Sequence, residues 1–113
     1  MQTVSDDRGH TWSPPEPLNF HGSPPHLLSH SSGALVCTYG CRQGDFGQRA
    51  MVSRDGGESW DYDLILRDDG SDGDLGYPSS VELADGSIFT VYYQRERPGA
   101  QCALLWTRWA LPD

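Results

Sequence analysis

Residues 53–60 read SRDGGESW, and residues 5–12 read SDDRGHTW. Both octets follow the pattern Ser-x-Asp-x-Gly-x-Ser/Thr-Trp, and they are offset by 48 residues. Self-similarity at such a period is the sequence signature of a repeat architecture. The shared positions are Ser5, Asp7, Gly9, Thr11 and Trp12 in the first octet and Ser53, Asp55, Gly57, Ser59 and Trp60 in the second.

Each residue type in the octet suits a tight turn. Glycine permits the backbone conformations that a tight turn requires, and the Asp side chain accepts hydrogen bonds from N–H groups of its own turn. Ser and Thr hydroxyls do the same more weakly. The Trp ring buries a large apolar area and would hold the turn against its sheet. We therefore expect each octet to be the hairpin between the third and fourth strands of a repeat unit.

The repeat extends beyond the octets. Residues 25–35, PHLLSHSSGAL, and residues 78–88, PSSVELADGSI, share a plan of short strand, turn and strand onset at an offset of 53 residues. Gly33 and Gly86 stand where a hairpin needs a positive φ. The β-rich runs LVCTYG and IFTVYY follow the two turns. The unit is thus four antiparallel strands in about 50 residues, the anatomy of a propeller blade.

The predicted fold class is all-β, a β-propeller fragment of about two four-stranded antiparallel blades with two Asp-containing boxes. Residues 1–20 would be the last two strands of one blade, 22–67 a complete blade, and 76–110 three strands of the next. No useful length of chain shows helical periodicity. Trp106 and Trp109 have opposite parity on a strand, so one should pack between blades and the other should be exposed.

Composition limits the classes of partner. The formal net charge is -8, and the eight basic residues are scattered, which argues against nucleic acid and anionic membrane surfaces as partners. No apolar run reaches the roughly 18 residues that span a bilayer. The N-terminus is polar and acidic, unlike a signal peptide. We expect a soluble protein, whose compartment the sequence leaves open.

The sequence predicts no metal and no organic cofactor. Cys37 and Cys41 would lie about 13 Å apart on one strand, beyond the reach of a disulfide, so we expect buried thiols. His26 and His30 lack the helix and the Glu of a zinc-protease motif. The acidic loop 68–76 does not have the ligand order of an EF-hand, and the octets carry too few acidic ligands for calcium. This loop would border the surface in front of Tyr77.

The octet resembles the Asp box of the sialidase (neuraminidase) superfamily, whose BNR repeats build six-bladed propellers. Residues 74–94, DLGYPSSVELADGSIFTVYYQ, resemble the last-blade segment of such proteins, and residues 47–60, GQRAMVSRDGGESW, resemble the blade before it. Nearly the whole chain is covered, which corresponds to about a third of a propeller and to its C-terminal part. Sortilin-like receptors and photosystem assembly factors also carry the box, so it specifies the fold more closely than the activity.

The resemblance implies two site residues, which lie 28 positions apart. Tyr77 occupies the place of the family's nucleophilic tyrosine, and Arg49 that of the third member of its arginine triad. A neutral tyrosine avoids repulsion by the carboxylate on the anomeric carbon of a sialic acid, although it needs an adjacent base. A guanidinium matches that carboxylate in bidentate fashion. Without the resemblance, Tyr77 would be a packing aromatic and Arg49 an exposed strand residue.

Parts of the family's machinery are not identifiable in the chain. The Glu that activates the tyrosine, the acid/base Asp and two further arginines lie on earlier blades in sialidases. Tyr77 precedes Pro78, where well-characterised sialidases more often have Ser. This departure leaves the sugar undetermined.

Three hypotheses for the function follow. The chain is a fragment of a sialidase-like exo-glycosidase that hydrolyses terminal sialic acid or a related sugar with retention, and it is incomplete and inactive alone. Alternatively, it is a non-catalytic Asp-box propeller module that binds glycan or protein, or a remnant without function. The expected partners are a carbohydrate substrate and either the missing blades or further copies of the chain, because each blade face needs a neighbour.

Overall fold

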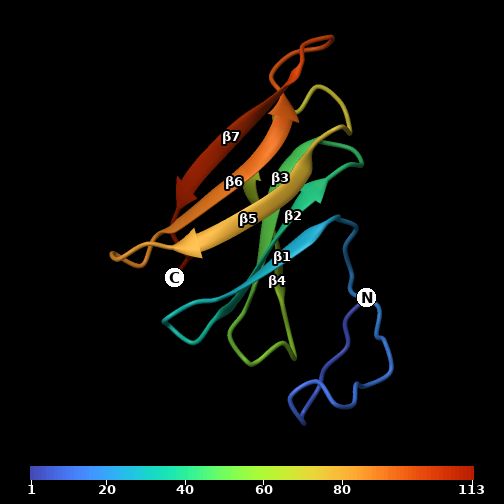
Figure 1. Ribbon diagram of the computed structural model, residues 1–113, viewed down its shortest axis with the longest axis vertical. Coiled ribbons are helices and arrows are strands. Elements are labelled where there is room, and N and C mark those ends of the chain that lie inside the picture. Colours follow the sequence, from blue (N-terminus) through green and yellow to red (C-terminus); the bar gives the residue numbers. More distant parts are fainter.

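The computed structural model describes residues 1–113 and contains two antiparallel sheets and no helix (Figure 1). The prediction of an all-β chain is therefore confirmed. The sheets have the strand orders β1-β2-β3-β4 and β5-β6-β7, so each strand pairs with its neighbours in sequence. The first sheet consists of β1 (Pro25–Ser29), β2 (Leu35–Cys41), β3 (Gly47–Ser53) and β4 (Asp61–Arg67), and the second of β5 (Gly76–Glu82), β6 (Ile88–Arg95) and β7 (Cys102–Trp109).

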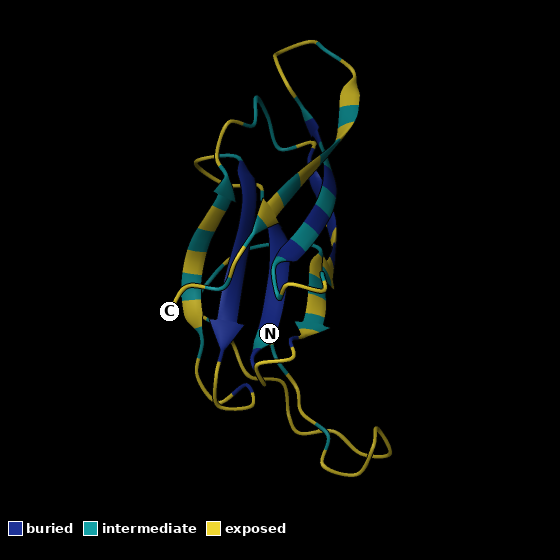
Figure 2. Cartoon of the chain, turned by 90° about the vertical axis from the view of Figure 1, so that its left-hand side faces the viewer, coloured by how far each residue is buried: buried dark blue, intermediate teal, exposed yellow.

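The strands differ in burial according to what covers their two faces. β3 is buried throughout and β2 nearly so, and these central strands form the dark core of Figure 2. In contrast, β5 and β6 alternate between buried and more exposed residues, as expected for a sheet with one packed face. Trp109 lies toward the other sheet and donates to the Thr90 hydroxyl at 3.0 Å. Trp106 is 61% exposed on the opposite face, so one of the two tryptophans is exposed, as their opposite parity predicted.

Small hydroxylated side chains join the two sheets. The Ser80 hydroxyl lies 3.0 Å from that of Thr38 and 2.9 Å from that of Thr90. The Ser80 N–H donates to Nδ1 of His26 at 3.2 Å. Since buried polar groups are costly unless paired, this ladder fixes the register in which β5 lies against β1 and β2.

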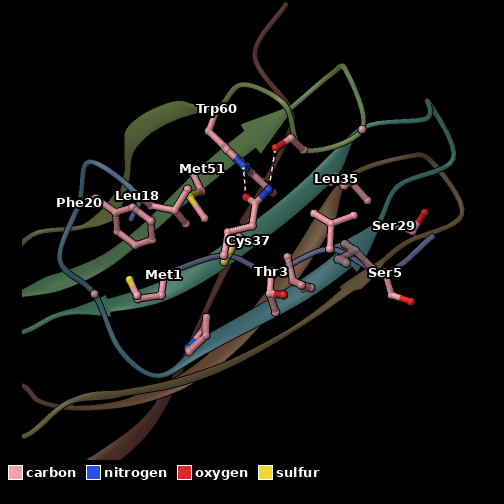
Figure 3. Close-up of a pocket in the computed structure, with 18 of the residues that line it drawn as sticks. Met1, Thr3, Ser5, Leu18, Phe20, Ser29, Leu35, Cys37, Met51 and Trp60 are labelled. Atoms are coloured by element: carbon pink, nitrogen blue, oxygen red, sulfur yellow. Dashed lines mark hydrogen bonds between the residues drawn. The ribbon is translucent and has the colours of Figure 1, made fainter. Parts of the chain in front are cut away.

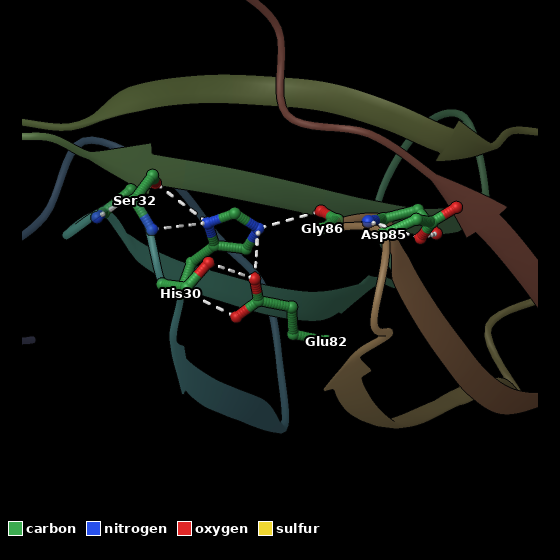
Figure 4. Close-up of polar contacts among 8 residues, drawn as sticks. His30, Ser32, Glu82, Asp85 and Gly86 are labelled. Atoms are coloured by element: carbon green, nitrogen blue, oxygen red, sulfur yellow. Dashed lines mark hydrogen bonds and ion pairs between the residues drawn. The ribbon is translucent and has the colours of Figure 1, made fainter.

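A second contact joins the two hairpin turns (Figure 4). Nδ1 of His30 accepts a bond from the Ser32 N–H at 3.1 Å, so the proton is on Nε2. Nε2 therefore donates to the carbonyl oxygen of Gly86 at 2.9 Å and lies 3.3 Å from the Glu82 carboxylate. That carboxylate also accepts bonds from the N–H and hydroxyl of Ser31. The first sheet's turn is thus tied to the second sheet by one imidazole and one carboxylate.

Replacing His30 with Leu is expected to lower the free energy of unfolding by about 1–3 kcal/mol, because the Gly86 and Ser32 partners lose their hydrogen bonds. Urea denaturation followed by circular dichroism measures the change. His10→Leu is the matched control, since His10 is exposed in the N-terminal segment. Equal stability of the two variants would show that the turn contact contributes nothing.

The first 20 residues do not form the two strands that the sequence predicted. They contain one isolated bridge, in which Gln2 and Glu16 exchange two backbone hydrogen bonds of 2.7 Å. The segment forms an open loop below the first sheet (Figure 1). Two strands need further neighbours to be stable, and neither sheet of the chain extends to this segment.

The cysteines are all free, but only Cys37 is fully buried. Burial raises its pKa to about 11. Cys41 is half-buried because it ends β2, which corrects the prediction of a second buried thiol, and Cys102 is exposed. No helix that is long and apolar enough to cross a membrane is present.

Candidate functional site

The two Asp boxes form the same hydrogen-bond network. Between β3 and β4, Asp55 accepts bonds at one oxygen from the Ser53 hydroxyl (2.8 Å) and the Ser59 N–H (2.9 Å). Its other oxygen accepts from the Ser59 hydroxyl at 2.5 Å, and the Gly57 N–H donates to the Ser53 hydroxyl at 2.8 Å. The first box repeats this arrangement with the residues Ser5, Asp7, Gly9 and Thr11. The box is thus a closed turn in which the Asp carboxylate and the first Ser hydroxyl each accept a backbone N–H.

The two box tryptophans differ. Trp60 packs against the core of Cys37 and Met51 and donates to the Gln2 side chain at 2.9 Å (Figure 3). Trp12 is 61% exposed, contrary to the expectation that it would be buried against a sheet. Trp12 is exposed because no sheet lies beneath this turn, since residues 1–20 form no strands.

Acid is expected to destabilise the chain as the pH falls from about 4 to about 2. Hydrogen bonds lower the pKa of Asp7, Asp55 and Asp85 to about 2, against about 3.9 in an unfolded chain. A lowered folded pKa contributes stability that is present above the unfolded pKa and is lost as the pH falls through the folded one. The melting temperature measured between pH 7 and pH 2 should therefore be level above pH 5 and fall below pH 4.

Removing the hydrogen bond that lowers the pKa of Asp55 most tests whether the box carboxylates cause this acid sensitivity. Ser59→Ala removes the hydroxyl that contributes most to the lowered pKa of Asp55. It should reduce the stability at pH 7 and leave a smaller drop between pH 5 and pH 2. Thr11→Val makes the equivalent change at Asp7, in the segment that forms no sheet, and should have less effect. An unchanged pH profile in Ser59→Ala would contradict the assignment.

A cavity of about 710 Å³ lies between the N-terminal segment and the face of the first sheet that points away from the second sheet (Figure 3). Its lining is largely apolar, and it exists because the segment covers this sheet face incompletely. The labelled lining residues are Met1, Thr3, Ser5, Leu18, Phe20, Ser29, Leu35, Cys37, Met51 and Trp60.

A polar and aromatic cluster lies at the end of the sheets that is opposite to the Asp-box turn between β3 and β4. The loops 42–46, 68–75 and 96–101 lie at one end of the strands, at the top and right of Figure 1, and we call this the loop end. β5 begins there, so Tyr77, its second residue, lies beside these loops.

Tyr77 has an unusual backbone conformation. Its φ is 49° and that of Gly76 is 119°, and the pairing of β5 with β6 shifts register between Gly76 and Ser79. A left-handed φ is a genuine outlier for a bulky side chain, and the residue before a proline such as Pro78 normally favours extended backbone. Bulges of this kind re-aim a side chain, and the Tyr77 side chain is 66% exposed. Such stored strain clusters at functional sites.

Two side chains accompany the Tyr77 ring. The Arg42 guanidinium lies 5.8 Å from the ring centroid, within the range of cation–π attraction. Its Nε donates to the carbonyl oxygen of Leu75 at 3.0 Å, which ties the loop after β2 to the loop before β5. The Tyr93 ring lies 5.9 Å away at an interplanar angle of 35°.

Asp74 connects this cluster to its surroundings. It accepts a bond from the Tyr93 hydroxyl at 3.0 Å and pairs with Arg95 at 2.7 Å. The Tyr93 bond is the largest cause that lowers the pKa of Asp74. Burial, followed by the bond to Asp74, raises the pKa of Tyr93. The loop end thus presents an exposed tyrosine, a guanidinium and a fixed carboxylate.

The structure does not bring Arg49 to Tyr77. Arg49 is 7% exposed, and its guanidinium donates to the carbonyl oxygens of Arg67 (3.0 Å) and Asp45 (3.2 Å). It is paired with Tyr39 across the ladder, so both side chains lie on the same sheet face. That face is opposite to the one that packs on β5, since the neighbouring residue Thr38 contacts Ser80.

The sequence pattern did not single out Arg42, because the family resemblance points to Arg49 in the strand that leads into the Asp box. Arg42 follows the last residue of β2 and begins the loop 42–46, RQGDF. The available signal was its position at the strand end, because loops that border a site leave from strand ends.

A family model described as a BNR repeat-like domain matches residues 1–90. The chain therefore belongs to this sialidase-type family of Asp-box repeats, and the match includes both boxes, Arg42 and Tyr77. The chain is also similar to a crystal structure of a protein of unknown function from Dyadobacter fermentans DSM 18053, with a TM-score of 0.86 and 27% identity. The similarity covers 97% of this chain but only 30% of that one. No curated protein matches the chain.

Proposed function

We propose that this chain is part of a sialidase-like β-propeller. In this proposal residues 22–67 form one blade, residues 76–110 form three strands of the next, and residues 1–20 end the blade before them. Three observations support it: two successive antiparallel sheets packed face to face, an Asp box between the third and fourth strands of the first sheet, and a structural relative more than three times as long.

We further propose that the propeller is an exo-glycosidase in which Tyr77 is the nucleophile. The single observation that carries this role is the left-handed, exposed Tyr77 beside Arg42. A packing aromatic has no need of a strained backbone, whereas the bulge at Tyr77 turns its ring outward, as a nucleophile that must face the substrate requires. The substrate class is a terminal sugar with a carboxylate on its anomeric carbon, because a neutral phenol can approach that carbon where a carboxylate would be repelled.

The reaction proceeds in two displacements. The Tyr77 hydroxyl oxygen attacks the anomeric carbon as its proton passes to a base, and the bond to the leaving oxygen breaks as an acid protonates that oxygen. Water then attacks the same carbon, gives its proton to the group that acted as the acid, and releases Tyr77, which regains a proton. The configuration is retained. The base and the acid come from blades outside these residues.

Arg42 is the arginine of this chain that we assign to the substrate carboxylate. Its guanidinium is oriented by the Leu75 carbonyl oxygen and lies beside Tyr77, whereas Arg49 is engaged with backbone carbonyl oxygens. A guanidinium at this position also stabilises negative charge that develops on the phenol oxygen.

The experiment is hydrolysis of aryl glycosides by a complete propeller that contains this chain. We expect hydrolysis of a sialoside, no hydrolysis of the matching neutral glycoside, and a first product of retained anomeric configuration in proton NMR. An inverted product would contradict a tyrosine nucleophile. Binding of the sugar without turnover would favour the alternative function, a propeller module that binds glycan.

The exposed apolar face of the second sheet supports the proposal of further blades. Val81, Leu104 and Trp106 are 53%, 78% and 61% exposed on the face of the second sheet that points away from the first. We propose that this face packs on another antiparallel sheet of the propeller, as β5 packs on β1 and β2 within the chain.

The 113-residue chain alone is therefore expected to self-associate through this face, and Leu104→Lys with Trp106→Lys should reduce the association. Sedimentation velocity at several concentrations measures it. Ile65→Lys is the matched control, because Ile65 is an exposed residue of the first sheet, at 59%. A wild-type chain that stays monomeric at every concentration would contradict the expectation.

A further inference from the structure

We propose that Tyr93 is a positioning residue that holds the Tyr77 ring in place, and that Asp74 and Arg95 hold Tyr93. The inference rests on the proposed role of Tyr77. Tyr93 itself contacts neither the substrate nor the reacting atoms in this proposal.

Tyr77 has few contacts that could fix its ring. Its side chain is 66% exposed, and its aromatic and cationic neighbours are Arg42 and Tyr93. Arg42 reaches the ring from a loop, while Tyr93 belongs to β6 and is paired directly with Gly76, the residue before Tyr77. Tyr93 is therefore the neighbour on a regular element, and side chains on such elements position a site more accurately than those on loops.

The geometry of the two rings is that of an interacting pair. Their centroids lie 5.9 Å apart with a tilt of 35°, within the range over which aromatic pairs attract. The outward turn of the Tyr77 backbone at the bulge would otherwise leave the ring free to change rotamer. The Tyr93 ring closes one side of that space.

Tyr93 is fixed in turn by its hydroxyl. The hydroxyl donates to one oxygen of Asp74 at 3.0 Å, and Arg95 donates to the other oxygen at 2.7 Å. Arg95 also pairs with Asp72 at 3.1 Å. Asp74 lies just before the strand that carries Tyr77, so the same bonds fix both the Tyr93 ring and the backbone that leads into Tyr77.

The Tyr93–Asp74 pair raises a competing role, because a tyrosine bonded to a carboxylate is also the arrangement of an activated nucleophile. Two observations favour positioning. Asp74 is neutralised by Arg95, and burial raises the pKa of Tyr93, which makes its hydroxyl harder to deprotonate. Of the two tyrosines, Tyr77 is the exposed one with the strained backbone, so we assign the nucleophile to Tyr77 and the positioning role to Tyr93.

The test labels the full chain with 3-fluorotyrosine and records fluorine NMR. The chain has five tyrosines, and the Tyr77 resonance is assigned by its loss in Tyr77→Phe. We expect Tyr93→Leu to move the Tyr77 resonance toward the position of free fluorotyrosine and to narrow it, because the ring becomes mobile. Tyr93→Phe, which keeps the ring, should retain most of the wild-type shift, and Asp74→Ala should give an intermediate shift.

Tyr62→Leu is the matched control. Tyr62 belongs to β4 in the other sheet, where its ring packs on Phe20, so this substitution should leave the Tyr77 resonance in place. An unchanged Tyr77 resonance in folded Tyr93→Leu would overturn the proposal. If that variant does not fold, an unchanged Tyr77 resonance in folded Asp74→Ala would overturn it. Because the measurement does not depend on turnover, it can fail while Tyr77 is shown to be the nucleophile, and it can succeed while hydrolysis is absent.

Discussion

Tyr77→Phe is expected to abolish sialoside hydrolysis by the complete propeller while leaving the fold unchanged. Loss of a catalytic nucleophile lowers kcat by about 10³-fold or more. The substitution removes one oxygen atom from an exposed side chain and keeps the ring that contacts Arg42 and Tyr93. Hydrolysis of an aryl sialoside at saturating and at low substrate concentration measures kcat and kcat/KM. Thermal unfolding should give a melting temperature close to that of the wild type.

Tyr77→Gly distinguishes a functional tyrosine from a packing tyrosine. Glycine adopts a φ of +49° without the strain that a bulky side chain bears, and the aromatic pair that the substitution removes contributes only about 0.5–1.5 kcal/mol. We expect an inactive protein whose stability is equal to or greater than that of the wild type. A clearly destabilised Tyr77→Gly, with activity retained in Tyr77→Phe, would instead identify Tyr77 as a structural residue.

Gly47→Ala is expected to destabilise the protein more than a glycine-to-alanine substitution at any other glycine of the first sheet. A Cβ at Gly47 would lie 1.9 Å from the carbonyl oxygen of Arg67, 2.7 Å from its carbonyl carbon and 2.9 Å from the Cα of Asp68. All three atoms belong to the backbone at the end of β4, so no rotamer change relieves the clash. We expect a loss of more than about 3 kcal/mol in the free energy of unfolding, measured by urea denaturation.

Gly33→Ala is the control for Gly47→Ala. Gly33 has a φ of +89° and no atom within 4 Å of a Cβ position, so alanine there bears only the left-handed backbone penalty of about 1–2 kcal/mol. The expected order of stability is wild type, Gly33→Ala, Gly47→Ala. A Gly47→Ala variant as stable as Gly33→Ala would mean that β3 and β4 lie farther apart at this end than the structure places them.

The strands and the Asp-box turn were predictable because local chemistry specifies them. The octet between β3 and β4 contains each donor and acceptor of its own network, so its pattern alone defines the turn. Gly33 and Gly86 adopt the positive φ that the hairpin pattern required. Such features depend on neighbours in sequence, and periodicity and turn residues report them directly.

The site was harder to predict because it depends on strand register and on stored strain. Arg49 and Arg42 both precede the Asp box, and only the register, which pairs Arg49 with Tyr39, shows that Arg49 lies on the other sheet face. The left-handed φ of Tyr77 runs against the preference of a residue before proline. Strain of this kind is imposed by the surrounding structure and leaves no local signal.

The N-terminal segment shows that a turn motif can be predicted from local sequence where the strands beside it cannot. The first Asp box has the complete network of the second, yet Trp12 is exposed and no strands flank it. A turn motif therefore forms without its sheet, while a strand requires a partner strand. For this reason the motif of residues 5–12 is present in the chain and strands beside it are not.

Covalent trapping tests most directly whether Tyr77 is the nucleophile of a sialidase-like site. The complete propeller is incubated with a 3-fluorosialosyl fluoride, which forms the first intermediate faster than water removes it, and the digested protein is analysed by mass spectrometry. We predict one sugar adduct on the peptide that contains Tyr77, located on its side chain and missing in Tyr77→Phe. An adduct on another residue, or hydrolysis by Tyr77→Phe at the wild-type rate, would contradict the claim.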